Sequence, residues 1–200
     1  MRARLALASA DVQVHLREVW LRDKPPAFLE ASPTATVPCL QVGDRVIDES
    51  YDIMLWALGL NDPEGWLSMP DSGLTLIEEC DGPFKTALDR YKYSSRHGDV
   101  DIAAERHAAG QYIDRLEALL TGHDWLYGAL PRLADMAILP FVRQFAHVDL
   151  AWFNAQPWPH VIRWLEVFKS SRRFTAIMTK YPQWQAGDAP VIFPAGEIYR

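Results

Sequence analysis

The residues TVPCLQVGDRVIDES, numbers 36–50, contain the pattern that decides the fold. Within them Gly43-Asp44 is a tight-turn signal between two short apolar segments, which predicts an antiparallel β-hairpin. Residues 36–42 turn into the first strand of this hairpin, and residues 45–47 form the second. Asp48-Glu49-Ser50 then leads into a helix that extends to about residue 58.

Upstream of the hairpin, the sequence predicts a helix, a strand and a second helix. Residues 2–8 have high helical propensity but no capping residue or turn before them, so the chain opens in mid-helix. Residues 12–19 alternate apolar and polar side chains, which is the period of a half-buried strand. Lys24-Pro25-Pro26 is a turn into a short helix. Residues 1–58 therefore have the predicted order α-β-α-β-β-α.

After the hairpin and its helix, the pattern becomes helical throughout. Gly59–Gly65 has the composition of a turn and is the predicted linker. Helices are expected at 74–91, from about 99 to 120, at 133–141, at 159–169 and at 171–180. Gly82-Pro83 should kink or break the first of them, and the chain beyond Tyr181 should be an extended arm. We predict two domains, residues 1–60 and residues 68–200.

Composition limits the possible classes of function. The chain of 200 residues has a formal net charge of −6 and no cluster of Lys and Arg, which argues against a nucleic-acid partner. Two cysteines are too few for a disulfide framework or a zinc site, and the six histidines do not cluster, so no metal is expected. There is neither a signal peptide nor an apolar run of about 20 residues for a membrane helix. We expect a cytoplasmic protein.

The Val37-Pro38 pair lies at the mouth of a predicted strand, where proline removes a ladder donor and marks a special backbone geometry. If this peptide bond is cis, the Val37 amide and carbonyl turn outward and can pair with an extended, peptide-like ligand. An ordinary trans proline on an edge strand is the alternative, and it is the commoner isomer. Val37 and Pro38 are thus candidate binding residues.

Glu49, Ser50 and Lys24 are the candidate charged and polar binding groups. Glu49 and Ser50 lie at a strand-to-helix junction, where unpaired amides and the positive end of the helix favour an anion. Ser50 can donate to a carboxylate while Glu49 accepts from an ammonium group, which suits an α-amino acid terminus. The alternative is that both simply cap the helix. Lys24 is either a solvated surface lysine or a partner for a second carboxylate at the far end of the ligand.

Several segments resemble one family, in order and with compatible spacing: RARLAL at 2–7, LRDKP at 21–25, TVPCL at 36–40 and IDES at 47–50. They resemble the cytosolic glutathione transferases, especially the bacterial and omega-like branches. LADMAILPF at 133–141 is similar to the central helical motif of that family. The resemblance extends over nearly the whole chain, to about Trp184.

This resemblance implies a truncated thioredoxin-like N-terminal domain followed by an all-helical C-terminal domain, with glutathione as co-substrate. By match to the family's motifs, the Val37 main chain next to Pro38 would pair with the cysteinyl part of glutathione. Glu49 and Ser50 would hold the γ-glutamyl end, and Lys24 would approach the glycyl carboxylate. The implied activity is conjugation to a small electrophile or glutathione-dependent exchange with a disulfide, in a homodimer. The alternative function is a non-catalytic binder of glutathione and apolar ligands, in which Tyr91, Tyr93, Trp125, Trp152 and Trp158 would line a cleft or would simply form core.

The sequence departs from the family where its first strand and active-site turn should precede Met1. That turn carries the family's Cys, Ser or Tyr, so no residue here inherits the catalytic role and weak activity is expected. Cys39 and Cys80 are expected in the core, and Tyr51 is expected to face along its helix. We expect Met1 to be internal to a longer protein; the alternative is a short form with a rearranged sheet. Loss of the strand should expose ladder groups that invite pairing.

A smaller departure concerns the start of the helix at 133–141. Arg132 stands where the family usually has Ser or Thr, which forms a capping box with the Asp three residues later. An arginine side chain cannot accept an amide hydrogen bond. We therefore predict a loss of about 1 kcal/mol relative to a Ser or Thr cap, while Asp135 still favours the helix start through the helix dipole.

Overall fold

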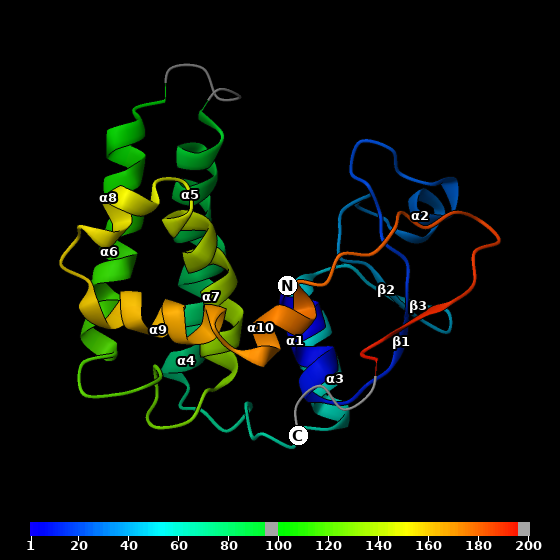
Figure 1. The fold of residues 1–200 in the computed structure, drawn as a ribbon, viewed down its shortest axis with the longest axis horizontal. Helices are drawn as coiled ribbons and strands as arrows, with labels where there is room; N and C mark the ends of the chain where they lie inside the picture. The colour runs from blue at the N-terminus through cyan, green and yellow to red at the C-terminus, as the bar shows by residue number, and fades with distance from the viewer. Residues whose placement is uncertain (95–99, 196–200) are drawn as a thin grey trace. The chain divides into compact units, whose positions relative to one another are not determined.

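The computed structural model describes residues 1–94 and 100–195, which form two compact units. The first unit comprises Met1–Gly65 together with the chain from Ser171 onward, and the second comprises Trp66–Ser170. Figure 1 shows the small sheets and short helices of the first unit and the longer helices of the second. The domain limits predicted from the sequence, 1–60 and 68–200, stay a prediction.

The first unit begins with the predicted order of elements. It contains α1 (Arg2–Ser9), β1 (Val14–Leu16), α2 (Pro26–Ala31), β2 (Leu40–Val42), β3 (Arg45–Ile47) and α3 (Ser50–Leu60). Helices α1 and α3 pack against each other, and Ala3, Ile47 and Ile53 form a buried cluster beside them. The α-β-α-β-β-α prediction is confirmed, although β1 is shorter than the eight residues whose side chains alternate.

The hairpin forms at the predicted turn. β2 pairs with β3 in an antiparallel register that places Leu40 opposite Ile47 and Val42 opposite Arg45. Gly43 has a φ of +58°, in the left-handed region that a residue without a Cβ adopts most readily. The turn chemistry therefore fixes the register, which brings Ile47 into the core and leads the chain directly to the start of α3.

The C-terminal arm has more structure than the sequence predicted. After α10 (Arg172–Ile177), the chain continues to β4 (Val191–Phe193), which pairs antiparallel with β1. Val14 lies opposite Phe193, and the Phe193 side chain is buried. The expectation of exposed ladder groups is thus corrected for one edge of β1, because a strand of the same chain occupies it. Among the described residues, β2 and β3 form a separate two-stranded sheet.

The second unit consists of helices. They are α4 (Ser72–Glu79), the π-helix η1 (Cys80–Phe84), α5 (Lys85–Lys92), α6 (Ile102–Leu119), α7 (Leu133–Ala146), α8 (Leu150–Asn154) and α9 (Pro159–Lys169). Helix α7 is the central one, and nearly all its side chains are buried, as its apolar sequence predicted. Nowhere in residues 1–94 or 100–195 does a helix combine the length and hydropathy needed for a bilayer span.

Two helix boundaries differ from the prediction. Gly82-Pro83 was expected to kink or break a helix, but η1 keeps the chain helical from α4 into α5. A wider π turn suits a residue that lacks an N–H donor. Helix α6 was expected to begin near Asp99, which lies outside the described residues. It begins at Ile102 because the Asp101 carboxylate accepts from the amides of Ala103 and Ala104.

The start of α7 is held by Asp135 rather than by the residue before the helix. The fully buried Asp135 carboxylate accepts from the amides of Arg132, at 2.8 Å, and Leu126, at 2.9 Å. It also accepts from the Trp164 indole N–H at 3.0 Å. The Asp135 half of the capping box is therefore present, and it ties α7 to a preceding loop and to α9 as well.

Candidate functional site

The N-terminus of α3 carries two of the predicted binding residues. Glu49 is the residue before the helix and has an extended backbone, and its carbonyl accepts from the Ile53 amide at 3.0 Å. Its carboxylate is exposed and makes no capping hydrogen bond, and the half-buried Ser50 makes none either. Within the described part of the chain, neither side chain has a hydrogen-bond partner. The helix-capping alternative therefore does not describe these two residues.

Val37 and Pro38 precede β2 and present an open stretch of main chain. The peptide bond between them is cis, which is the isomer that the predicted pairing with an extended ligand requires. Val37 is 45% exposed, and Pro38 is half-buried. The Val37 N–H and C=O groups have no hydrogen-bond partner among residues 1–94 and 100–195. A donor and an acceptor are thus available at this position.

Lys24 lies in the loop between β1 and α2, one residue after a turn closed by the Asp23 amide on the Trp20 carbonyl at 2.9 Å. Its side chain is half-buried, and it forms no ion pair with any described residue. All five predicted binding residues therefore belong to the first unit, and their backbone or side-chain polar groups remain available. That they converge on a single ligand stays a prediction.

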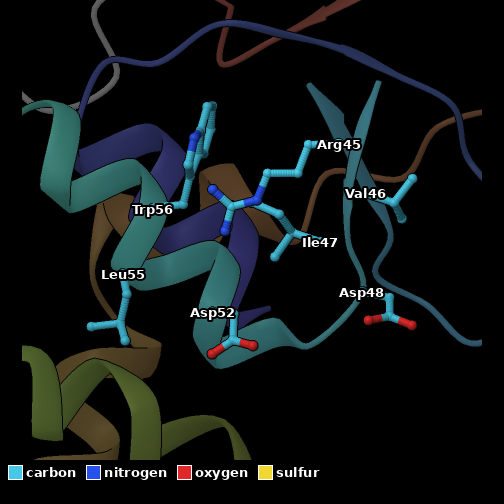
Figure 2. A pocket seen from close by; sticks show the side chains of 7 residues that line it. All are labelled: Arg45, Val46, Ile47, Asp48, Asp52, Leu55 and Trp56. Carbon is cyan, nitrogen blue, oxygen red and sulfur yellow. The ribbon is translucent and has the colours of Figure 1, made fainter. Parts of the chain in front are cut away.

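A separate hollow of about 470 Å³ lies between β3 and α3, and no pattern in the sequence indicated it. Figure 2 shows the Arg45 side chain extending from β3 toward α3, near Trp56. The residues that line the hollow are Arg45, Val46, Ile47, Asp48, Asp52, Leu55 and Trp56. Leu55 is 39% exposed, so this wall of the hollow is open to solvent. None of the predicted binding residues lines the hollow, although Asp48 and Asp52 flank Glu49-Ser50 in sequence.

The two thiols lie in surroundings that do not favour nucleophilic chemistry. Burial raises the pKa of the Cys39 thiol and outweighs a lowering by its hydrogen bond with Ser32, and the nearby Asp48 carboxylate adds a smaller rise. The Cys39 Sγ lies 3.9 Å from the Ala31 carbonyl. Cys80 is completely buried within η1. Because the thiolate is the reactive form of cysteine, neither position is suited to attack a substrate.

The aromatic residues considered for an apolar ligand cleft are largely packed in the second unit. Tyr91 and Trp158 are buried, and Trp152 packs edge-on against Phe145 and Trp158. The Arg106 guanidinium lies over the Trp152 ring, 4.4 Å from its centroid. For these three residues the core-packing alternative holds. Tyr93 and Trp125 are half-buried.

Two family models match the chain over most of its length. One describes the N-terminal domain of glutathione S-transferase and matches residues 1–65, and the other describes the C-terminal domain of that family and matches residues 86–171. The chain belongs to the glutathione S-transferase family. The first match includes every predicted binding residue, and the second includes the central helix α7.

Solved structures of glutathione transferases have the same fold. A glutathione S-transferase from Actinobacillus pleuropneumoniae is 19% identical, with a TM-score of 0.68, over 87% of this chain and 84% of that one. A family member from Pseudomonas fluorescens, with two glutathione molecules bound, is 17% identical, with a TM-score of 0.72, over 87% and 85%. Glutathione S-transferase I bound to lactoylglutathione is 21% identical, with a TM-score of 0.69, over 87% and 90%.

The fold class predicted from the sequence is therefore correct. This glutathione S-transferase family chain combines small sheets and helices in its first unit with a helical second unit, the arrangement of a thioredoxin-like domain and an all-helical domain. The transferase assignment follows from the family.

Proposed function

We propose that this chain binds glutathione through its first unit and belongs to an enzyme that transfers glutathione to a small electrophile or exchanges it with a disulfide. The observation that carries the proposal is that the polar groups at Val37, Glu49 and Ser50 have no partner among the described residues, in a unit matched by the family's N-terminal domain. Glutathione has an amino acid terminus, a peptide centre and a second carboxylate, which complement these groups and Lys24 in order.

In each proposed contact, a ligand group of opposite charge, or with the complementary hydrogen-bonding role, replaces water. The Glu49 carboxylate receives the γ-glutamyl ammonium, and Ser50 with the N-terminus of α3 receives the γ-glutamyl carboxylate. The Val37 main chain pairs with the cysteinyl residue beside Pro38. The Lys24 ammonium approaches the glycyl carboxylate. Because these groups have no hydrogen-bond partner among residues 1–94 and 100–195, binding breaks no hydrogen bond within that part of the chain.

Isothermal titration calorimetry with glutathione tests this assignment. Glu49→Ala and Ser50→Ala should each weaken binding by about tenfold, the effect of a charge-assisted hydrogen bond worth ~1.5 kcal/mol. Glu30→Ala is the matched control, since Glu30 is an exposed carboxylate on α2 outside the proposed site. If affinity is unchanged in both Glu49→Ala and Ser50→Ala, the proposed ammonium–carboxylate clamp is wrong.

The reaction class is tested separately from binding. We propose weak turnover for the 200-residue chain, because Cys39 has a raised pKa and Cys80 is buried. Conjugation to a model electrophile at ordinary family rates would contradict this. An omega-like assignment favours thiol–disulfide exchange, so reduction of a mixed disulfide in preference to conjugation would support that branch. We also propose a homodimer, which sedimentation velocity would test.

A further inference from the structure

The chain after α10 returns across the first unit and contacts the loop that carries Lys24. We name residues 179–194 the C-terminal strap; its later part is the orange and red chain beside α2 and β1 in Figure 1. Its β4 pairs with β1, and its Trp184 amide donates to the Glu18 carbonyl at 3.0 Å. The Arg17 guanidinium lies 4.6 Å from the centroid of the Trp184 ring. The strap therefore follows the chain from β1 toward Lys24.

Gln183 makes the contact nearest to Lys24. Its Nε2 donates to both the main-chain carbonyl and the carboxylate Oδ2 of Asp23, each at 3.0 Å. Asp23 closes the turn with Trp20 and directly precedes Lys24. The Lys24 side chain has no partner of its own among the described residues. By holding the main chain at Asp23, Gln183 thus fixes the backbone position from which the Lys24 side chain extends.

We propose that Gln183 is a positioning residue for the glycyl end of glutathione, acting by fixing the turn from which Lys24 extends. The inference rests on the proposed function, because it takes Lys24 as the group that meets the glycyl carboxylate. Holding the turn before the ligand arrives lowers the conformational entropy lost on binding. Loss of the Gln183 hydrogen bonds would release the turn, and it should weaken only the contacts that Lys24 makes with the ligand.

Two ligands distinguish positioning from a general structural role. Glutathione carries the glycyl carboxylate, whereas γ-glutamylcysteine shares the γ-glutamyl and cysteinyl residues but ends in a cysteinyl carboxylate and has no glycyl residue. Gln183→Ala should weaken the binding of glutathione by about fivefold, the effect of one net hydrogen bond. It should leave the affinity for γ-glutamylcysteine unchanged. Gln185→Ala is the matched control: it is the same residue type in the same strap, and its exposed side chain has no partner among the described residues.

A double-mutant cycle completes the test, since it isolates the coupling between two positions. Lys24→Ala should remove the preference for glutathione over γ-glutamylcysteine. Adding Gln183→Ala to the Lys24→Ala variant should then change neither affinity further. An equal loss for both ligands in Gln183→Ala, or no loss for either, overturns the positioning role while glutathione binding stands. If the parent chain does not bind glutathione, the proposed function fails and this inference fails with it.

Discussion

Replacing Asp135 by asparagine should change how the stability of the protein depends on pH. Asp135 lies fully buried at the first turn of α7, where its carboxylate accepts from two main-chain amides and the Trp164 indole. Burial raises the pKa of this carboxyl to about 6 from the usual 3.8, although the three donors act in the opposite direction. Desolvation of the charge outweighs the hydrogen bonds.

The direction and size of this pH dependence follow from the linkage between protonation of Asp135 and folding. Between pH 3.8 and about 6 the folded state binds the Asp135 proton and the unfolded state releases it. The contribution of Asp135 to stability is therefore complete below about pH 4 and is lost as the pH rises through about 6. A pKa difference of about two corresponds to ~3 kcal/mol, of which ~2 kcal/mol falls between about pH 4.5 and 7.5.

Urea unfolding of the parent chain and of Asp135→Asn at several pH values would measure this. The other carboxylates titrate in both proteins, so the difference between their free energies of unfolding isolates position 135. The introduced amide does not titrate, and its NH₂ group would face main-chain N–H donors. We expect the parent's advantage over Asp135→Asn to shrink by about 2 kcal/mol from about pH 4.5 to 7.5. An advantage that grows over this range would mean that the three donors outweigh burial, and the reasoning would be wrong.

Two further predictions concern local backbone structure, with urea unfolding at neutral pH as the measurement. Arg132→Ser should stabilise the chain by about 1 kcal/mol, because a serine oxygen can accept an amide bond at the start of α7; no gain would show that Asp135 alone suffices there. Gly43→Ala should destabilise it by about 1 kcal/mol because of the positive φ at the hairpin turn, whereas Gly59→Ala, within α3 and with open space around it, should stabilise by about 0.5–1 kcal/mol. Equal effects at the two glycines would contradict the turn argument.

Local signals predicted most of the fold. The hairpin followed from Gly43-Asp44 and the apolar residues around it, because turn type and register depend on neighbouring residues alone. The central position of α7 followed from an apolar sequence on all faces. Helix α8 was not predicted because five residues are too few to show a helical period. Its one clear signal is Asp149, whose carboxylate accepts from the Trp152 amide.

Pairings between distant segments could not be predicted in this way. β4 is a three-residue strand in a Pro-rich arm, and its partner β1 lies near the other end of the sequence. No local period distinguishes such a strand from an unpaired arm. The contact of Gln183 with Asp23 and the hollow beside Arg45 and Trp56 are likewise products of tertiary packing. The sequence indicated which chemical groups the site needs, and the structure adds which of them have no partner in the part of the chain that it describes.

The contrast between satisfied and unsatisfied polar groups gives the candidate site its physical basis. In the second unit the buried Asp135 carboxylate has three donors, and the indole N–H of the buried Trp158 donates to the Asp114 carboxylate at 2.6 Å. A buried polar group without a partner would be strongly destabilising, so the Asp135 carboxylate and the Trp158 indole must bond within the protein. Glu49 and Val37 are exposed residues, so water is free to hydrogen-bond their polar groups in the absence of ligand. A ligand can replace that water without breaking any bond that stabilises the fold, which is why changes at Glu49 should alter glutathione affinity and leave the free energy of unfolding nearly unchanged.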